Sequence, residues 1–463
     1  MRKTKIVATI GPVCDSEEAI TDLIKAGVDV FRFNMKHGNV EWHSQRMSLV
    51  EKVCDKLGVR VAMLLDLQGP EIRIDHIPGG TRLLKQGDRF KFVPEGENDV
   101  VLDRPQIFEE VKVGQTVYAD DGFLEFKIVK VGKDFMEVEV VEGGELKERK
   151  TTNFVGARLG VKALVEKDLE HLSLVARHHV DFVALSFVRR AEDMKELRGV
   201  VAKYKVDCGV VAKIEHPEAV EHFNEILAES DAIMVARGDL GIEYPMEEVP
   251  GLQKMMIRRA REEGKPIIVA TQMLESMTTN VRPTRAEVSD VANAVYDGAD
   301  AVMLSGETAS GKYPLKAVKT MAKIVGRVDK DCDPGEIGDG VAGMDQTAIL
   351  LRAATEVARW DKEVKALVVL TDSGRKARLL SRLRPCLPIV ALSKKEKTVD
   401  MLKLSYGVMP MEFEYTRGER ISKMKISEML KHKGILLSGK FVLVYGNVAG
   451  DSGKTSVVRV MEV

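Results

Sequence analysis

The sequence is short of the residues that build extracellular, metal-centred or membrane proteins. Its nine histidines include no H-E-x-x-H motif, so a histidine-based metal centre is not expected. No apolar run approaches the roughly 20 residues of a membrane span. The five cysteines are odd in number and scattered, which predicts free thiols in a reducing compartment, the cytoplasm: Cys14, Cys54, Cys208, Cys332 and Cys386.

An excess of charge of either sign is also absent. The net charge is −1 over 463 residues, so no overall field attracts nucleic acid or an anionic membrane. The composition, 44% hydrophobic and 30% charged, is that of a soluble globular protein. The N-terminal MRKTKIVATIGP is basic and then apolar, but its apolar part is too short for a secretory signal. Length alone suggests about three domains.

What the sequence does contain is a series of short, β-rich apolar runs. Segments with helical spacing separate most of them, which predicts parallel strands and an α/β fold, a (β/α)₈ TIM barrel. The eight predicted strands are residues 5–11, 28–35, 61–68, 181–188, 209–215, 231–240, 266–273 and 300–308.

In most of these runs, polar residues lie at or near the C-terminal end. In FRFNMKHG, residues 31–38, Arg32, Asn34 and Lys36 alternate with apolar residues, which predicts one polar row aimed at a shared pocket. The carboxyl ends of barrel strands meet on the face that carries catalysis. The other late polar residues are Asp66, Lys213, Glu215, Asp239, Thr271, Ser305 and Glu307.

Two regions interrupt or follow the β/α rhythm. Residues 74–156 contain short strands and Gly-rich turns, which predicts a small all-β lid domain inserted on the catalytic face. After the Gly/Asp-rich linker DPGEIGDG, alternating helices and strands predict a C-terminal α/β domain at 336–463. The barrel then comprises residues 1–73 and 157–335.

Three motifs at strand ends suggest chemistry, each beside a structural alternative. AKIE places Lys213 and Glu215 on one strand face, either for anion neutralisation or as a salt bridge. ARGDLG offers Asp239 among backbone N–H groups, suiting Mg²⁺ with Glu215 or forming an ordinary turn. ATQMLESM and LSGETASG supply hydroxyls and a carboxylate that either relay a proton or cap helices: Thr271, Ser305 and Glu307.

Two glycine-containing loops in the C-terminal region suit phosphate. GNVAGDSGKT fails as a Walker A loop because Val448 occupies a required glycine position, but its Gly/Ser composition fits backbone anion binding. TDSGRKA, residues 371–377, places threonine, serine and glycine at the start of a predicted helix, where backbone N–H groups can also bind phosphate. Plain capping explains either alone; together they predict an effector site at Thr371, Ser373, Gly374, Arg375, Ser452 and Gly453.

With these residues in view, the chain resembles the pyruvate kinase family over essentially its full length. The matching stretches are KIVATIGP, the RxNxxHG of RFNMKHG, LLDLQGPEIR, AKIEHPEAV, IMVARGDLG, ATQMLESM, RPTRAEVSDVANAV and AVMLSGET. The family has the barrel, lid and C-terminal domain predicted above. The resemblance implies a cytoplasmic glycolytic enzyme, usually a homotetramer, that transfers the phosphoryl group of phosphoenolpyruvate to ADP, giving ATP and pyruvate.

The resemblance also implies residue roles. Lys213 stabilises the transferring group and the enolate, while Arg32 and Arg73 hold phosphoryl oxygens. Glu215 and Asp239 bind Mg²⁺ or Mn²⁺. The further implied roles are proton delivery by Thr271, Ser305 and Glu307, substrate-carboxylate binding by the backbone of Gly238 and Asp239, and nucleotide contacts from His37, Lys150 and Arg73.

One departure from the family concerns its monovalent cation. Asn34, Asp66 and Leu67 match cation-site positions, but Lys36 replaces a serine that helps to hold K⁺. Glu71 stands where K⁺-independent relatives usually have lysine. We hypothesise that the Lys36 ammonium performs the cation's role; the alternative is that Lys36 points to solvent or pairs with Glu71. K⁺ dependence stays open at this point.

A second departure is FVGARLGVKAL at the return hinge of the lid, where two family prolines are missing. This leaves lid mobility open. Two other functions remain as alternatives: another barrel enzyme acting on phosphoenolpyruvate or a 2-keto acid, and a non-catalytic sugar-phosphate-binding regulator. The identity of any phosphorylated effector is not readable from the sequence.

Overall fold

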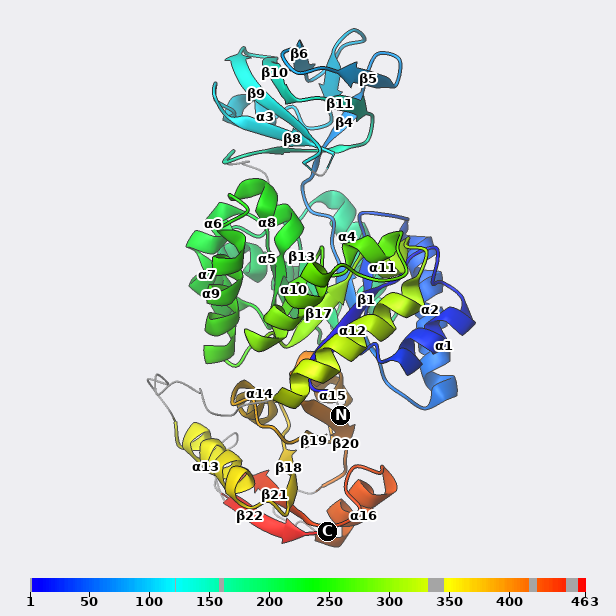
Figure 1. Cartoon of the computed structure of the whole chain (residues 1–463), viewed down its shortest axis with the longest axis vertical. Helices are drawn as coiled ribbons and strands as arrows, with labels where there is room; N and C mark the ends of the chain where they lie inside the picture. The colour runs from blue at the N-terminus through cyan, green and yellow to red at the C-terminus, as the bar shows by residue number, and fades with distance from the viewer. Residues whose placement is uncertain (1, 121, 158–161, 332–344, 416–422, 447–456) are drawn as a thin grey trace.

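The computed structural model describes residues 2–120, 122–157, 162–331, 345–415, 423–446 and 457–463, arranged as three domains stacked end to end (Figure 1). The middle domain is a closed barrel of eight parallel strands, which confirms the predicted fold class. Around the barrel the strands follow the order β1-β17-β16-β15-β14-β13-β3-β2. Their bounds are β1 Lys5–Thr9, β2 Val30–Asn34, β3 Ala62–Asp66, β13 Phe182–Leu185, β14 Gly209–Ile214, β15 Ala232–Ala236, β16 Ile267–Ala270 and β17 Ala301–Leu304.

Apolar strand residues pack on both sides of the barrel wall. One set, including Val30 and Met234, fills the interior, and another, including Phe31 and Val235, packs against the surrounding helices. Burial on both faces explains why the strands are continuously apolar. The main barrel helices are α1 Glu17–Ala26, α2 Val40–Leu57, α4 Glu166–Leu172, α5 Ala191–Lys203, α7 Phe223–Glu229, α9 Val249–Glu262, α10 Arg285–Tyr296 and α12 Pro314–Val328.

Local sequence signals set the ends of several helices. The Ser16 side chain accepts a hydrogen bond from the backbone N–H of Ala19 at the start of α1, and Gly27 ends the helix in the left-handed region at φ 109°. Thr284 and Glu287 form a reciprocal capping box at the start of α10. These caps fix where each helix begins relative to the preceding strand.

Every predicted strand ends later than the observed one, and four overshoot by three or four residues, including 181–188, which ends at Leu185. The run 231–240 ends at Ala236 because ARGDLG starts a short helix, α8 (Arg237–Glu243). The run 266–273 ends at Ala270, and 300–308 ends at Leu304 before helix α11 (Gly306–Ala309). The polar residues that follow these strands therefore lie on helix starts and turns, not within strands.

The inserted segment forms a second closed barrel, with strand order β10-β6-β7-β4-β12-β8-β9 and a separate hairpin-like sheet β11-β5. The chain enters it at β4 and returns through β12, and Phe126 and Val138 lie in its own apolar core. Its strands are β4 Ile72–His76, β5 Thr81–Leu84, β6 Arg89–Val93, β7 Val100–Leu102, β8 Thr116–Ala119, β9 Leu124–Val131, β10 Met136–Glu142, β11 Gly144–Lys147 and β12 Thr151–Phe154, with helix α3 at Ile107–Glu110.

The C-terminal domain is a five-stranded sheet of order β20-β19-β18-β21-β22. Two of its elements were not predicted: edge strand β20 (Val408–Glu412), which contains Pro410, and helix α16 (Lys423–His432). Proline weakens a strand pattern but is tolerated at a sheet edge. The other elements are α13 Gln346–Trp360, β18 Val364–Leu370, α14 Arg375–Arg382, β19 Ile389–Ser393, α15 Glu396–Met401, β21 Lys440–Tyr445 and β22 Val457–Glu462. The linker DPGEIGDG lies outside the described residues.

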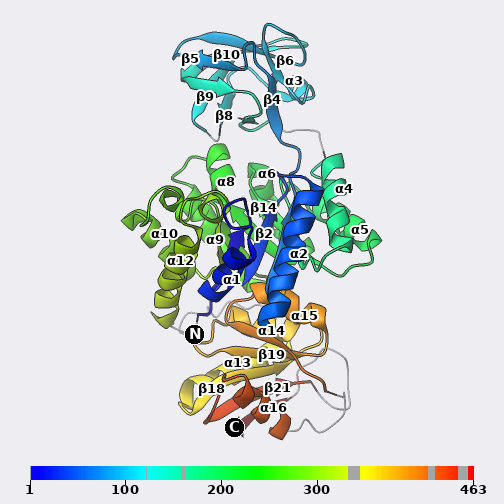
Figure 2. The same cartoon turned by 90° about the vertical axis from the view of Figure 1, so that its right-hand side faces the viewer.

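The C-terminal domain closes the barrel end opposite the lid. Figures 1 and 2 show α14 and α15 between the barrel and the C-terminal sheet. Leu404, from the short turn after α15, packs with the apolar residues inside the barrel. Arg384 pairs with Asp300 across this boundary, at 3.0 Å from Nη1 to Oδ1. None of the described helices has the length and apolarity needed to cross a bilayer.

Candidate active site

Lys213 lies at the centre of a polar cluster on the lid-facing end of the barrel. It is 3% exposed near the end of β14, and its Nζ is 2.8 Å from Oε1 of Glu215 and 3.3 Å from Oδ1 of Asp66. It also donates to Oγ of Ser186 at 2.6 Å. The Lys213–Glu215 salt bridge, which was the structural alternative, is therefore present, but Asp66 of β3 also pairs with Lys213.

Arg32 extends this cluster from β2. Its Nε donates to Oδ2 of Asp66 at 2.6 Å, and its Nη1 donates to Oγ1 of Thr9 at 3.0 Å. Burial alone would raise the pKa of Asp66, but Lys213 and Arg32 outweigh it and hold that pKa below its usual value. Burial likewise opposes charge on Lys213, yet Asp66 and Glu215 raise the pKa of its ammonium. The ammonium and the Asp66 carboxylate are both charged at neutral pH.

Glu71 joins two further cations. Its Oε1 is 2.5 Å from Nζ of Lys36, and its Oε2 is 2.6 Å from Nη2 of Arg73. The structure thus shows the Lys36–Glu71 pair that was the alternative to the cation hypothesis. Lys36 does not point away from the site, however. Burial lowers the pKa of its ammonium, but Asp239, Glu71 and Glu215 together raise that pKa by more than burial lowers it. Its ammonium also lies 5.7 Å from the centre of the Phe187 ring.

The other residues predicted for the monovalent cation have internal partners. Oδ1 of Asn34 accepts from the backbone N–H of Lys36 at 3.2 Å. The backbone carbonyl of Leu67 accepts from Oγ of Ser186 at 2.7 Å. Asp66 is shared by Arg32 and Lys213. The oxygens expected to hold K⁺ therefore already contact groups of the chain.

Charges in this connected network balance. Four cationic side chains pair with three carboxylates, the charge of Asp239 acts on Lys36 as a fourth, and most of these groups are buried. An anionic substrate entering here needs added positive charge or displacement of a carboxylate. The eight groups are Arg32, Lys36, Arg73 and Lys213 with Asp66, Glu71, Glu215 and Asp239.

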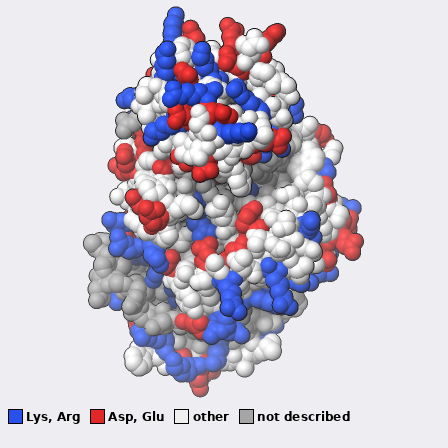
Figure 3. All heavy atoms as spheres, turned by 45° about the horizontal axis from the view of Figure 1, so that its top comes forward, with Lys and Arg blue, Asp and Glu red and all other residues white. Residues whose placement is uncertain are grey.

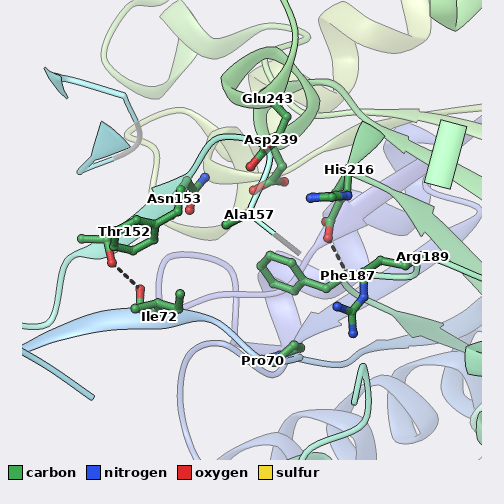
Figure 4. Close-up of a pocket in the computed structure, with 12 residues that line it drawn as sticks. Pro70, Ile72, Thr152, Asn153, Ala157, Phe187, Arg189, His216, Asp239 and Glu243 are labelled. Carbon is green, nitrogen blue, oxygen red and sulfur yellow. Dashed lines mark hydrogen bonds between the residues drawn. The ribbon is translucent and has the colours of Figure 1, made fainter. Parts of the chain in front are cut away.

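Glu215 and Asp239 line one cavity between barrel and lid, and Figure 4 shows Asp239 among the residues around it. Oε2 of Glu215 accepts from the backbone N–H of Phe187 at 2.9 Å, and burial raises the pKa of Glu215 against the effect of Lys213. Asp239 points into the cavity from α8, with Glu243 beside it. Thr152 and Asn153 line the lid side. In the described residues no three His, Cys, Asp or Glu side chains form a metal-binding group. The predicted pair, Glu215 and Asp239, lines the same cavity.

Thr271 follows β16 in an unusual backbone conformation. Thr271 and Gln272 have φ of 67° and 54°, a region that disfavours residues other than glycine. The Nη2 of Arg237 donates to the Thr271 carbonyl at 3.0 Å, while its Nη1 pairs with Oδ1 of Asp290 at 2.7 Å. The backbone N–H of Gly238, predicted to bind substrate carboxylate, here donates to Oγ1 of Thr271 at 2.7 Å. Arg237 therefore fixes the turn that presents Thr271.

Ser305 and Glu307 follow β17. Both carboxylate oxygens of Glu307 accept backbone N–H groups, from Leu274 at 3.0 Å and from Ser305 at 2.7 Å. Glu307 is fully buried, which raises its pKa. Glu307 therefore joins the loops after β16 and β17 through their backbone N–H groups. Oγ of Ser305 is buried and has no hydrogen-bond partner among the described residues, so it is available to a ligand or water.

The predicted nucleotide residues come from both the lid and the barrel. Lys150, just before β12, pairs with Asp120 of the lid at 2.5 Å, and its side chain is 41% exposed. The His37 side chain is exposed overall, but neighbouring atoms partly desolvate its ring, which lowers its pKa. A second cavity of about 1520 Å³ continues between lid and barrel beside α8, and Figure 3 shows the hollow beneath the lid. The hollow gives the site access to solvent.

The predicted effector residues are only partly described. Gly374 has φ 75° and precedes α14, and Arg375 pairs with Asp345 at 2.9 Å. Ser373 is exposed, whereas Thr371 is only 3% exposed, so its side chain does not face solvent. Ser452 and Gly453 lie outside the described residues.

Sequence reasoning missed Ser186, Arg237 and Thr9. Ser186 is a late polar residue of the run 181–188, so the rule that found Asp66 also covers it. Arg237 was read only as a neighbour of Gly238; nothing in the sequence indicates that its side chain turns back to the loop after β16.

The comparisons with known proteins agree on one family. Residues 1–318 match the family "Pyruvate kinase, barrel domain", and residues 348–461 match "Pyruvate kinase, alpha/beta domain". The chain is 38% identical over 473 residues to a pyruvate kinase of Staphylococcus aureus strain MRSA252, covering 99% of this chain and 80% of the relative, and a second S. aureus strain, bovine RF122, gives the same values. A crystal structure of a pyruvate kinase from Cryptosporidium parvum superposes with a TM-score of 0.92 at 32% identity, covering 99% of this chain and 96% of that one.

Proposed function

Because the chain belongs to the pyruvate kinase family, we propose that it transfers the phosphoryl group of phosphoenolpyruvate to ADP and releases pyruvate. The chain is a phosphotransferase, and the comparisons do not favour the alternative barrel enzyme or the non-catalytic regulator. The observation that carries the proposed reaction is the buried, charged Lys213 ammonium among acidic partners, on the barrel end that faces the lid.

In the first step, the bond between phosphorus and the enol oxygen breaks, and a bond forms from phosphorus to an ADP β-phosphate oxygen. Lys213 neutralises charge on the moving group and on the enolate oxygen left behind. Arg32 and Arg73 orient the phosphoryl oxygens. Because this chemistry depends mainly on positioning and charge neutralisation, fixed cations supply most of what the chain contributes.

In the second step, the enolate carbon takes a proton and becomes the methyl group of pyruvate. Thr271 is presented at this position by its constrained turn, and the partnerless Oγ of Ser305 suits a water that carries the proton. Glu307 holds the two loops together through their backbone N–H groups. It acts as a positioning residue.

The residues present fit a divalent metal. Glu215 and Asp239 face one cavity, and burial raises the pKa of Glu215, a cost that a bound cation offsets. Mg²⁺ favours one or two carboxylates with substrate oxygens and water. When bound, Mg²⁺ or Mn²⁺ supplies the positive charge that the balanced network lacks. Glu215 and Asp239 hold and orient it.

Two further residues complete the nucleotide side, Lys150 on the lid and His37 on the barrel. We expect both to approach the ADP phosphates when the lid domain, residues 74–156, closes. Closure excludes water from the phosphoryl group and so prevents hydrolysis. The barrel at 1–73 and 157–335 supplies the remaining groups, and the domain at 336–463 is a regulatory unit with a phosphorylated effector. A cytoplasmic homotetramer completes the proposal; size-exclusion chromatography with light scattering tests the oligomeric state.

The Lys36 ammonium replaces the monovalent cation. It lies beside Glu71 and raises the positive potential at Asp239 and Glu215, as a dissolved cation would. The predicted K⁺ ligands are satisfied internally. We therefore expect turnover without added K⁺.

A coupled assay tests the reaction. The purified chain should form pyruvate from phosphoenolpyruvate only with ADP and Mg²⁺ present, and EDTA should stop turnover. Pyruvate release without ADP would favour the other barrel enzyme. Binding of sugar phosphates with no turnover under any condition would favour the regulator.

Arg237→Met tests the positioning of Thr271. We expect kcat to fall by roughly 10- to 100-fold with KM for ADP unchanged, because a misplacement near 1 Å has costs of this order. Arg258→Gln, an exposed residue on α9, is the matched control. Unchanged kcat in Arg237→Met would show that the turn keeps its shape without the guanidinium.

A further inference from the structure

A small cleft, partly open to solvent, lies where the C-terminal domain meets the barrel, at the end away from the lid. On the barrel side, its lining includes Lys265 just before β16 and Asp300 just before β17. On the other side it includes residues of α14 and the segment after it, and Figures 1 and 2 show α14 at this boundary. We call it the arginine cleft, lined by Arg261, Gly264, Lys265, Pro266, Asp300, Arg378, Ser381, Arg382, Arg384 and Ser405.

The lining has a large excess of positive charge. Five cationic side chains face one carboxylate, Asp300, and Arg384 already pairs with it at 3.0 and 3.1 Å. In the part of the chain that the structure describes, the other four cations have no carboxylate within 4.0 Å: Arg261, Lys265, Arg378 and Arg382. Proteins rarely gather cations at a domain boundary without a counter-charge.

The hydrogen bonds that these cations make leave some of their N–H donors unused. Arg261 Nε donates to the carbonyl of Arg382 at 3.0 Å, and Arg382 Nη1 donates to the carbonyl of Glu262 at 2.9 Å. Lys265 donates to the Leu227 carbonyl at 2.6 Å. The Arg378 guanidinium makes no hydrogen bond or ion pair with any described residue. These carbonyl contacts hold the groups in place without neutralising them.

Two buried polar atoms of the cleft also have no partner among the described residues. Oγ of Ser405 belongs to a residue that is 1% exposed, and Nε of Arg382 is buried. Buried polar atoms are nearly always hydrogen-bonded, so such atoms in a cationic cavity indicate a missing acceptor. Burial lowers the pKa of Arg261, Lys265, Arg378 and Arg382, as expected for cations gathered without a counter-ion.

We propose that the arginine cleft binds the phosphate group of a small phosphorylated metabolite. Guanidinium forks match phosphate oxygens in geometry and charge, and Lys265 and Ser405 add single donors. The occupied cleft joins the barrel to α14 through one anion.

The cleft connects to the active site through two strands. Lys265 and Asp300 precede β16 and β17, and the far ends of these strands lead to Thr271 and Ser305. An anion held from both domains therefore fixes α14 against the strands that carry the proton-delivery residues. The cleft shares no residue with the predicted effector loop, Thr371–Arg375, and the proposal does not depend on which reaction the barrel catalyses.

Isothermal titration calorimetry of the full chain tests the proposal, with orthophosphate as the probe and NaCl holding ionic strength constant. We expect a saturable site whose affinity falls at least tenfold in Arg378→Gln. Arg258→Gln, on the exposed side of α9, and Arg375→Gln, in the effector loop, should retain it. Superimposable isotherms for the wild type and Arg378→Gln, or loss only in Arg375→Gln, would overturn the proposal, as would the absence of saturable binding.

A second variant tests a residue that the barrel contributes to the cleft. Lys265→Met should weaken the same site although it lies in another domain, and circular dichroism with a thermal melt checks that both variants fold. Parallel titrations with diphosphate and a sugar monophosphate identify the source of the phosphate group: a tighter sugar phosphate indicates a metabolite, and a tighter orthophosphate indicates the free ion. If Lys265→Met folds and binds like the wild type, the cleft does not join the two domains through the anion.

Discussion

Replacing Lys213 with methionine should lower kcat by about 10³- to 10⁵-fold, the range seen when a phosphoryl-transfer enzyme loses a cation that acts on the transition state. Methionine nearly matches the length of the lysine side chain, so packing changes little while the charge disappears. Asp66 and Glu215 then lose the ammonium that lies 3.3 and 2.8 Å from them. The site becomes net negative where an anionic substrate must enter.

The measurement is steady-state pyruvate formation with saturating Mg²⁺ and both substrates, with a thermal melt to confirm folding. Lys195→Met, on the exposed face of α5, is the matched control and should leave kcat unchanged. Lys213→Arg tests whether charge alone suffices: we expect little recovery, because the wider guanidinium does not fit among Ser186, Asp66 and Glu215. A kcat within tenfold of the wild type in Lys213→Met would contradict the role assigned to the ammonium.

The eight barrel strands were predictable because strands buried on both faces are continuously apolar, and most of them are followed by a helical pattern. The ends were not equally predictable. The predicted strand 231–240 includes ARGDL, but the backbone turns into α8 at Arg237. Strand β20 was missed because VMPME contains a proline and lies at an edge, where pairing on one side suffices.

The site was predictable as a set of positions but not as a set of partners. Late polar residues on parallel strands must meet at one barrel end, which brings Lys213 and Asp66 together from strands distant in sequence. Which oxygen contacts which cation depends on side-chain direction and on the path of the loops. The sequence therefore offered both the Lys36–Glu71 pair and the replacement of a cation as exclusive alternatives, whereas the structure allows one ammonium to do both.

Lys36→Ser should turn a K⁺-independent enzyme into a K⁺-dependent one. The four cations and four carboxylates of the network balance, and removing Lys36 leaves one uncompensated negative charge beside Glu71. At 4 Å and an effective dielectric constant near 20, a unit charge pair is worth about 4 kcal/mol, whether the cation is tethered or dissolved. We expect turnover in K⁺-free buffer to fall by roughly 10- to 100-fold and to recover when K⁺ is added.

Potassium titration of kcat in the wild type, Lys36→Ser and Lys52→Ser decides the question. Lys52 is an exposed lysine on α2 that pairs with Glu17, so its loss removes a charge without touching the network. In the wild type and Lys52→Ser, kcat should not change with K⁺ concentration, and only in Lys36→Ser should it rise. The rise should be larger with K⁺ than with Na⁺, because the serine restores an oxygen ligand beside Asn34. A wild type strongly activated by K⁺ would show that Lys36 only neutralises Glu71. A Lys36→Ser variant fully active without any added cation would show that Arg73 alone satisfies Glu71, and that the site needs no monovalent charge at this position.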